Sequence, residues 1–189
     1  GYRALLDNAT RSYNTALGYG TDVYLDNSND NTIIGALAGV EGSNSTVIGY
    51  QAYTNGSNVA LLGNTTTLFC GGYVNWTNYF SDSRLKTNVK ENVKGLDFIM
   101  RLRPVTYHIN IEALYKLQGR SSYGNAVDKM TDAMKAEKDK NISAKEAVNM
   151  SGFIAQEVEK AAQESGYDFD GIKKPQNDKD NYGLSYATF

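Results

Sequence analysis

The chain has 189 residues, a formal net charge of −2 and a hydrophobic fraction of 41%. This charge excludes the broad basic face of a general nucleic-acid binder, and no apolar run reaches the roughly 18 residues that a membrane span needs. The lone Cys70 excludes an internal disulfide and the lone His108 excludes a multi-histidine metal site, so we expect no metal and no cofactor.

Residues 1–80 contain a repeat. The segments TALGYG, TIIGALAG, TVIGYQA and ALLGNTT align on glycines that are 17, 14 and 14 residues apart, namely Gly18, Gly35, Gly49 and Gly63. Two apolar residues precede each glycine, and turns rich in Asn and Gly separate the copies. This period predicts a β-solenoid with one or two short strands per coil, with each glycine at a tight turn or close to the next coil. The alternative, a low-complexity linker, would not need paired apolar residues in register.

Each coil offers only about two side chains to a core, which is thin for a single stack, so we expect other chains to supply the missing burial. The repeats resemble the heads of trimeric autotransporter adhesins. That resemblance implies an all-β fold for residues 1–69, in which three chains form a trimeric β-roll. Tyrosines in the repeat also allow a second interpretation, a surface that binds host glycans; they are Tyr2, Tyr13, Tyr19, Tyr24, Tyr50 and Tyr53.

The composition changes near residue 80. Residues 1–80 hold no lysine and seven charged residues, whereas residues 81–189 hold 13 lysines among 33 charged residues. Between the two parts, CGGYVNWTNYF at 70–80 interrupts the repeat and brings four aromatic side chains, so we expect a stalk or connector there. Cys70 is expected to be a small buried or stalk residue.

The second part predicts an α+β fold. Apolar spacing and breakers predict helices at 95–102, 126–138 and 152–166, the last ended by Gly166. A β-branched and aromatic run predicts a strand at 105–109, which places His108 in a sheet. SAKE at 143–146 is a capping box that predicts a further short helix, and 167–181 is expected to be a charged loop. The side chains expected to face inward are Leu96, Ile99, Leu102, Val127, Met130, Met134, Ile154, Val158, Ala161 and Ala162.

The segment SDSRLK at 81–86 holds a serine and a lysine five positions apart. Serine is a poor nucleophile until a base takes its proton, and lysine serves as that base only when it is neutral. Because a free lysine has a pKa of about 10.4, Lys86 would need a desolvated pocket, with Arg84 as a candidate neighbouring cation. Neither a helix nor a flat strand brings positions five apart together, so the pair requires a turn through 82–84 or a contact between chains. Taken alone, the segment fits a polar helix cap better than a catalytic pair.

Two further motifs support a functional interpretation of the 81–86 segment. Leu-Arg-Pro-Val-x-Tyr stands at 102–107, and Gly-Phe-x-Ala-Gln-Glu-Val stands at 152–158. The three motifs in this order resemble the carboxy-terminal intramolecular chaperone domain of phage endosialidases and tail fibres. Two features differ from the family: an insertion at 110–150, and an end at YGLSYATF where a long helix usually follows. The repeat is already under way at residue 1, so we also expect the sequence to be a fragment of a longer chain.

The resemblance implies a fold and a function for 81–189. Such domains trimerise, template the β-structured fibre that precedes them, and then release themselves by autoproteolysis. It implies cleavage between Phe80 and Ser81, with Ser81 as nucleophile and Lys86 as base of a Ser-Lys dyad. The partners it implies are two further copies of the chain and the upstream fibre region, at an extracellular location on a virion tail fibre or a bacterial surface. For Gln156 and Glu157, which lie in the third motif, a structural role at a helix start is favoured.

Two alternatives remain open at this level. The first is a trimerisation module with the same fold that does not cleave itself. The second is an adhesin or fibre tip whose repeat binds host-surface glycans. The domain boundaries that we expect are repeats at 1–69, a connector that contains the cleavage site at 70–80, and the α+β domain at 81–189.

Overall fold

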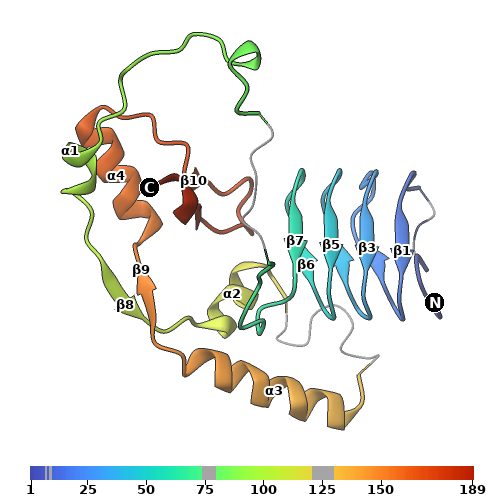
Figure 1. The fold of residues 1–189 in the computed structure, drawn as a ribbon. Coiled ribbons are helices and arrows are strands. Elements are labelled where there is room, and N and C mark those ends of the chain that lie inside the picture. The colour runs from blue at the N-terminus through green and yellow to red at the C-terminus, as the bar shows by residue number, and fades with distance from the viewer. Residues whose placement is uncertain (7, 9, 74–79, 121–129) are drawn as a thin grey trace. The chain divides into compact units, whose positions relative to one another are not determined.

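The computed structural model describes residues 1–6, 8, 10–73, 80–120 and 130–189 (Figure 1). The predictions that concern Val127 and the connector residues 74–79 lie outside these residues. The chain forms two compact units, each assembled from three segments. The solenoid unit comprises Gly1–Cys70, Tyr107–Met150 and Lys174–Asn181, and the second unit comprises Gly71–Thr106, Ser151–Lys173 and Tyr182–Phe189. No helix in the described residues is both long and apolar enough to cross a membrane.

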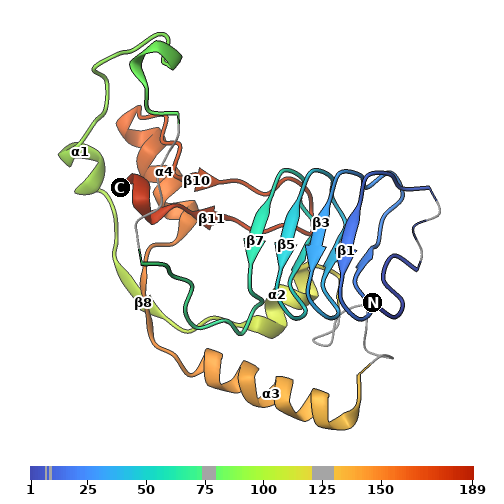
Figure 2. The ribbon, with the colours of Figure 1, turned by 45° about the vertical axis from the view of Figure 1, so that its right-hand side comes forward.

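The repeat folds into a β-solenoid with two short strands in a coil, as the sequence predicts (Figure 2). One parallel sheet contains β1 (Thr15–Leu17), β3 (Thr32–Ile34), β5 (Thr46–Ile48) and β7 (Ala60–Leu62). The other contains β2 (Asp22–Val23), β4 (Gly39–Val40) and β6 (Tyr53–Thr54). Since neighbours in each sheet come from successive coils, the hydrogen bonds of both sheets run along the stack.

The register of the larger sheet sorts each apolar pair into one inward and one outward side chain. Ala16, Ile33, Val47 and Leu61 stack in one row, and Ile33 and Val47 are fully buried in the solenoid core. Side chains alternate between the two faces of a strand, so the second members of the pairs form a row on the other face. This outward row consists of Leu17, Ile34, Ile48 and Leu62, none of which is buried.

The repeated glycines allow the coils to approach one another closely, as predicted. Gly35 has a φ of +132°, and a Cβ atom there would lie 2.6 Å from the carbonyl carbon of Gly49. At Gly18, where φ is +144°, a Cβ atom would lie 2.6 Å from the Gly35 carbonyl oxygen. A side chain at these positions would meet both backbone strain and a steric clash.

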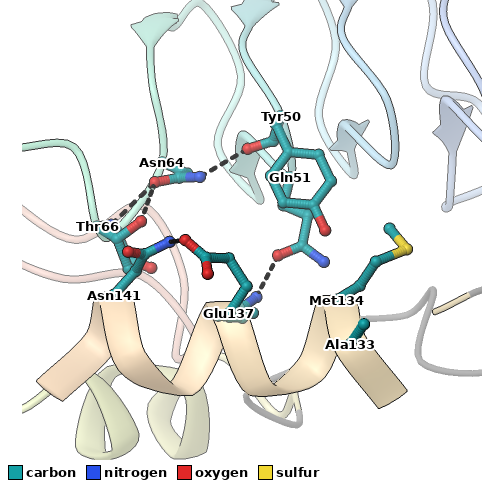
Figure 3. A pocket seen from close by; sticks show the side chains of 10 residues that line it. Tyr50, Gln51, Asn64, Thr66, Ala133, Met134, Glu137 and Asn141 are labelled. Atoms are coloured by element: carbon teal, nitrogen blue, oxygen red, sulfur yellow. Dashed lines mark hydrogen bonds between the residues drawn. The ribbon is translucent and has the colours of Figure 1, made fainter. Parts of the chain in front are cut away.

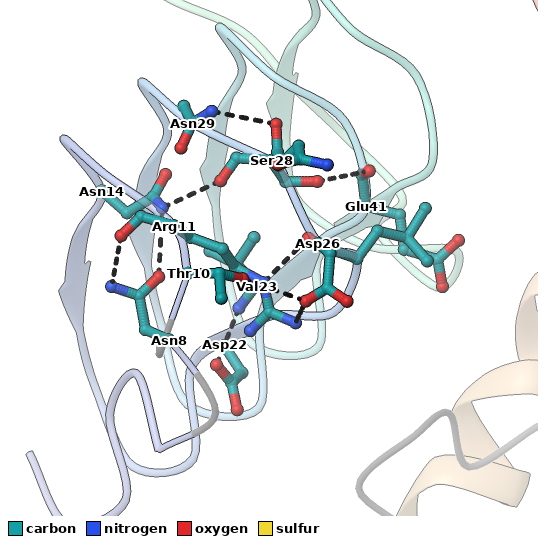
Figure 4. A network of polar contacts seen from close by, with 12 residues as sticks. Asn8, Thr10, Arg11, Asn14, Asp22, Val23, Asp26, Ser28, Asn29 and Glu41 are labelled. Atoms are coloured by element: carbon teal, nitrogen blue, oxygen red, sulfur yellow. Dashed lines mark hydrogen bonds and ion pairs between the residues drawn. The ribbon is translucent and has the colours of Figure 1, made fainter.

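Polar side chains tie the coils together at one corner (Figure 4). Asn31, which is 1% exposed, donates from Nδ2 to Asn14 Oδ1 at 3.1 Å and to the Gly42 carbonyl at 3.0 Å. Its Oδ1 accepts from the Ser45 backbone N–H at 2.9 Å. A buried amide with partners on three sides fixes the register of adjacent coils, because an unpaired one would be costly.

Two helices from the 107–150 segment pack within the solenoid unit. Helix α2 (Ile111–Leu117) starts at an Asn110 cap, and α3 (Asp132–Glu146) starts at a Thr131 cap. Tyr115 of α2 shares a 2.7 Å hydrogen bond between its hydroxyl and Thr65 Oγ1. Met130 and Met134 pack with Leu37, so both methionines face inward as predicted, although Met130 precedes the helix.

The prediction that a new helix starts at the 143–146 capping box is wrong. These residues form the last turn of α3, so no new helix starts there. The reason is that residues 132–146 contain no Gly or Pro, and a helix that has begun at Thr131 continues without a breaker. The predicted helix at 126–138 and the predicted short helix are thus one element from residue 132 onward.

The second unit is α+β, with an aromatic core. Its elements include a 3₁₀ turn at Ser83–Leu85, α1 (Leu96–Ile99), α4 (Ala155–Ser165), and the antiparallel strands β10 (Ile172–Lys173) and β11 (Gly183–Leu184). A second 3₁₀ turn lies at Tyr186–Thr188, and β8 (Val105–Tyr107) pairs with β9 (Met150–Gly152). Val158, Ala161 and Ala162 of α4 are buried with Phe98 and Phe169, and Gly166 ends α4 in the left-handed conformation, as predicted.

Three details of the second unit differ from prediction. Helix α1 is one turn long and buries Phe98, while Leu96 and Ile99 are exposed; a single turn is too short for a periodic face, and the large ring occupies the core. Ile154 is the exposed N-cap of α4. The 167–181 region is not entirely loop, because it contains β10.

Candidate functional site

The segment 81–86 folds as a tight turn that joins its serine to its lysine. Asp82 caps the 3₁₀ turn Ser83–Leu85 by accepting a hydrogen bond from the Arg84 backbone N–H at 2.9 Å. The chain then leaves the turn in an extended conformation at Lys86. Lys86 Nζ lies 3.3 Å from Ser81 Oγ, within hydrogen-bond distance. A turn through 82–84 is the intrachain arrangement that the spacing required.

The charges of the turn are paired locally. Arg84 donates two hydrogen bonds to the Asp82 carboxylate, from Nε to Oδ1 at 3.1 Å and from Nη2 to Oδ2 at 2.7 Å. These hydrogen bonds lower the pKa of Asp82 and raise that of Arg84. Because its charge is compensated by Asp82, Arg84 is a weaker source of positive potential for Lys86 than an unpaired guanidinium would be.

Ser81 and Lys86 are both exposed to solvent in the single chain. In the contact that is present, an ammonium donates to the serine hydroxyl, whereas general-base chemistry needs a neutral amine that accepts the serine proton. Large apolar side chains near the pair in sequence are exposed too; they are Phe80, Leu85, Val89 and Val93. The turn therefore brings the serine and lysine side chains together without the dry surroundings that Ser-Lys chemistry would need.

The other two sequence motifs meet through an ion pair. Arg103 of the second motif holds Glu157 of the third with Nε–Oε2 at 3.0 Å and Nη2–Oε1 at 2.5 Å. The pairing lowers the pKa of the Glu157 carboxyl and raises that of Arg103. Glu157 is in the first turn of α4, where a carboxylate also complements the helix dipole. Its role in this geometry is to join two segments that are 54 residues apart.

The remaining residues singled out in the sequence take structural positions. His108 lies just after β8 instead of within it, with Nδ1 2.8 Å from the Glu146 carbonyl oxygen. Cys70 is a free, exposed thiol, so the buried alternative for it is wrong. In the described parts of the chain, no group of three His, Cys, Asp or Glu side chains is arranged to hold a metal ion.

The structure adds a cavity in the solenoid unit that the sequence did not indicate. It has a volume of about 420 Å³ and lies between α3 and the coil ends around Tyr50 and Asn64 (Figure 3). Asn64 Nδ2 donates to the Tyr50 carbonyl at 2.8 Å, and Lys138 Nζ donates to Gln51 Oε1 at 2.5 Å. Since the residues of its two walls, 50–66 and 133–141, are far apart in sequence, no local pattern could have revealed the cavity.

Two positively charged side chains of the 107–150 segment, Lys138 and Arg120, are also buried. Lys138 is 8% exposed, and burial, assisted by repulsion from Arg120, lowers its pKa to about 8. Burial likewise lowers the pKa of Arg120, whose guanidinium stacks on Tyr53. Charged residues on a helical segment are usually solvated, so the sequence alone gave no reason to select these two.

The family described as chaperone of endosialidase matches residues 81–167. Comparisons with curated proteins and with solved structures found no match. The family implies autoproteolytic serine peptidase activity and trimerisation, and it suggests an extracellular location on a virion. The match begins at Ser81 and includes the Arg103–Glu157 pair. Residues 81–167 are therefore a chaperone-of-endosialidase domain of the peptidase S74 type, preceded in this chain by a β-solenoid.

Proposed function

We propose that residues 81–189 trimerise, template the folding of the β-solenoid before them, and then release it by cutting the Phe80–Ser81 bond with Ser81 as nucleophile and Lys86 as base. The observation that carries the proposal is the 3.3 Å separation of Ser81 Oγ and Lys86 Nζ. The two atoms meet in the turn at which the family domain begins. The mature solenoid is extracellular, on a virion or a cell surface.

The position of Ser81 directly after the bond that it cuts determines the chemistry. Neutral Lys86 takes the hydroxyl proton as Oγ attacks the Phe80 carbonyl carbon, and the C–N bond breaks as the proton passes to the Ser81 nitrogen. The product is an ester between the Phe80 acyl group and Ser81 Oγ. Water then hydrolyses that ester, which leaves a carboxylate on Phe80 and a free amine on Ser81. The reaction occurs once per chain.

Trimerisation supplies what the single chain lacks. The exposed Lys86 becomes an effective base only when water is removed from around it. Exposed apolar residues on both sides of the turn, among them Phe80, Leu85 and Val89, are the surface that neighbouring chains would cover. Cleavage is thereby coupled to assembly, because the dry site forms only when three chains have met.

The outward row of the solenoid supports the templating role. Leu17, Ile48 and Leu62 are exposed along one row of the stack, in which Ile34, between Leu17 and Ile48, is half-buried. Contiguous exposed apolar side chains are typical of association surfaces. Three solenoids held in register by the trimeric domain would bury these rows against one another, which adds apolar burial to the core that each stack already has.

The test is intact mass measurement of the full chain after expression. Wild type should yield two fragments whose masses sum to the 20.7 kDa chain plus one water, split between Phe80 and Ser81. Ser81→Ala and Lys86→Ala should remain whole, because a nucleophile–base unit loses nearly all activity when either member is removed. Ser83→Ala and Lys90→Ala, which alter neighbouring exposed residues, should cut normally. An uncut wild type that trimerises would instead establish the non-cleaving trimerisation module.

The glycan-binding alternative stays a prediction for the released solenoid. The cavity beside Tyr50 contains amide and carboxylate groups of the kind that bind sugars, but α3 supplies one of its walls. That wall belongs to the part of the chain that leaves after cleavage. A glycan array on the cut, purified solenoid would decide this role independently of the cleavage chemistry.

A further inference from the structure

Two tyrosine rings and a carboxylate gather on the smaller sheet of the solenoid. Tyr53 is in β6, while Tyr24 and Glu41 directly follow β2 and β4. Because these strands pair in parallel register, the three residues lie on neighbouring coils. The rings of Tyr24 and Tyr53 are 6.4 Å apart and tilted by 40°. We call Tyr24, Glu41 and Tyr53 the tyrosine–glutamate cluster.

The backbone makes room for this cluster. A Cβ atom at Gly39 would overlap the ring of Tyr24, so glycine at this position allows the ring to lie across the sheet. Tyr53 is 8% exposed, and burial, together with the nearby Glu41 carboxylate, raises the pKa of its phenol. The phenol therefore stays neutral, and the negative charge of the cluster is that of Glu41.

The cluster is occupied by a cation of the same chain. The guanidinium carbon of Arg120 lies 3.3 Å from the centroid of the Tyr53 ring. Both Glu41 and the tyrosines favour the charged form of Arg120, opposing the burial that lowers its pKa. An aromatic face with an adjacent carboxylate is a favourable environment for a desolvated cation.

The distance between the Arg120 guanidinium and the Tyr53 ring indicates which shape of cation fits the cluster. A separation of 3.3 Å is close to the contact distance of two flat groups, and a guanidinium is planar and stacks on aromatic rings in this way. A tetrahedral trimethylammonium group holds its charge behind methyl groups and would sit farther from the ring. The geometry therefore suits a guanidinium better than a quaternary ammonium.

Arg120 is not an ideal occupant. Among the residues that the structure describes, none accepts a hydrogen bond from its buried Nε. Its Nη1 donates a hydrogen bond to Gln118 Oε1 at a long 3.4 Å. A donor left unpaired in the interior weakens the net attraction that holds the side chain, so another guanidinium with a better set of acceptors can compete for the same ring.

We propose that the tyrosine–glutamate cluster is a guanidinium-binding site, filled by Arg120 in the uncut chain and available to an arginine side chain of a protein partner after release. The second half rests on the proposed function, since Arg120 lies on the carboxy-terminal side of the Phe80–Ser81 bond and the cluster on the amino-terminal side. Cleavage turns an intrachain contact into one that can dissociate. The 107–150 segment thus masks a recognition site of the fibre until assembly is complete.

Chemical rescue in a non-cleaving background tests the site itself. In the full-length Ser81→Ala chain, Arg120→Ala should lower the midpoint of thermal unfolding, and millimolar methylguanidinium chloride should restore it saturably. The rise should follow ligand binding to the folded state. Equal sodium chloride, or urea as an uncharged planar analogue, should restore nothing. The parent, which already holds its guanidinium, should show no rise.

A second substitution makes the rescue specific. Adding Tyr53→Leu to Arg120→Ala removes the ring and should abolish rescue while keeping an apolar residue at that position. Rescue that persists without Tyr53, or that sodium chloride reproduces, would overturn the site. Arg120→Gln serves the same comparison where the alanine variant does not fold, because the amide keeps bulk and polarity without charge.

The proposal that cleavage exposes the tyrosine–glutamate cluster is tested on wild-type protein that has cleaved itself. Titration calorimetry with methylguanidinium chloride should detect binding to the cut sample and none to uncut Ser81→Ala protein. Rescue in the first experiment without binding to the cut sample would overturn the unmasking while leaving the site in place. A wild type that never cuts would refute the proposed function, and the rescue experiment would still decide the site.

Discussion

The solenoid and the second unit differ in how their apolar side chains are packed. In the second unit, Phe98, Phe153, Phe169 and Phe189 pack on one another within a single chain. In the solenoid, one apolar row fills the core and a parallel row faces outward. The second unit has an aromatic core formed by one chain and exposes apolar residues mainly around the 81–86 turn, whereas the solenoid exposes apolar residues in a row that repeats from coil to coil. This difference is the physical basis for assigning the template role to the second unit and the dependent role to the solenoid.

Removing the centre of the aromatic core should give the largest effect. Phe98 is 2% exposed, so Phe98→Ala should lower the free energy of unfolding of the second unit by about 3–5 kcal/mol. Leu96→Ala is the matched control on the same helix, where a side chain that is 79% exposed should cost less than about 0.5 kcal/mol. Urea unfolding in the Ser81→Ala background measures both. Equal effects of the two substitutions would show that the aromatic cluster is not the core of this unit.

Adding a methyl group between two coils should give the second-largest loss of stability. Gly35→Ala combines a φ of +132° with a Cβ atom 2.6 Å from Gly49, and should destabilise the solenoid by about 3 kcal/mol. Gly95→Ala is the control, since Gly95 also has a positive φ but no atom within 4 Å of the added Cβ. It should cost only the backbone strain, about 1–2 kcal/mol. Comparable losses would mean that backbone strain, and not contact between coils, requires the glycines.

The buried lysine should give the solenoid unit a pH dependence. Lys138 has a folded pKa of about 8 against 10.5 in the unfolded chain, so the unfolded state binds more protons between these values. The free energy of unfolding should therefore rise by about 2 kcal/mol from pH 8 to pH 10, and this rise should disappear in Lys138→Met. Below pH 8 both states are protonated and the contribution is constant. Lys140→Met, an exposed control on α3, should keep the rise seen in wild type.

The outward row should matter least to the single chain and most to its association. Ile48→Asn changes a side chain that is 38% exposed, so it should alter the unfolding free energy of a monomer by about 0.5 kcal/mol or less. The same change places a polar amide in the row that we assign to the contact between solenoids. Light scattering should show weaker trimerisation than in wild type. A trimer of unchanged stability would place the contact between solenoids elsewhere.

The sequence predicted the solenoid better than it predicted the second unit, for a physical reason. A repeat shows the same requirement several times, so the glycines and the apolar pairs before them could be identified from period alone. Which member of each pair faces inward, such as Ile33 or Val47, became clear only from the strand register. Helix α1 offers a single turn, and nothing local indicates that Phe98 would displace Leu96 from the core. The Ser81–Lys86 pair was selected by motif and resemblance, and the turn that joins its atoms was one of the two arrangements allowed by spacing. The Tyr53–Arg120 stack joins residues 67 positions apart, which no local pattern can show.

The most direct test of the central claim is the cleavage rate of the full chain as a function of protein concentration at neutral pH. Freshly refolded chains would be followed by intact mass, with the oligomeric state measured in parallel by light scattering. Since Ser81 and Lys86 are exposed in one chain and lysine is a base only when neutral, cleavage should follow trimer formation and stop on dilution to monomers. A monomer that cuts at pH 7 as fast as the trimer would contradict the proposed coupling of release to assembly.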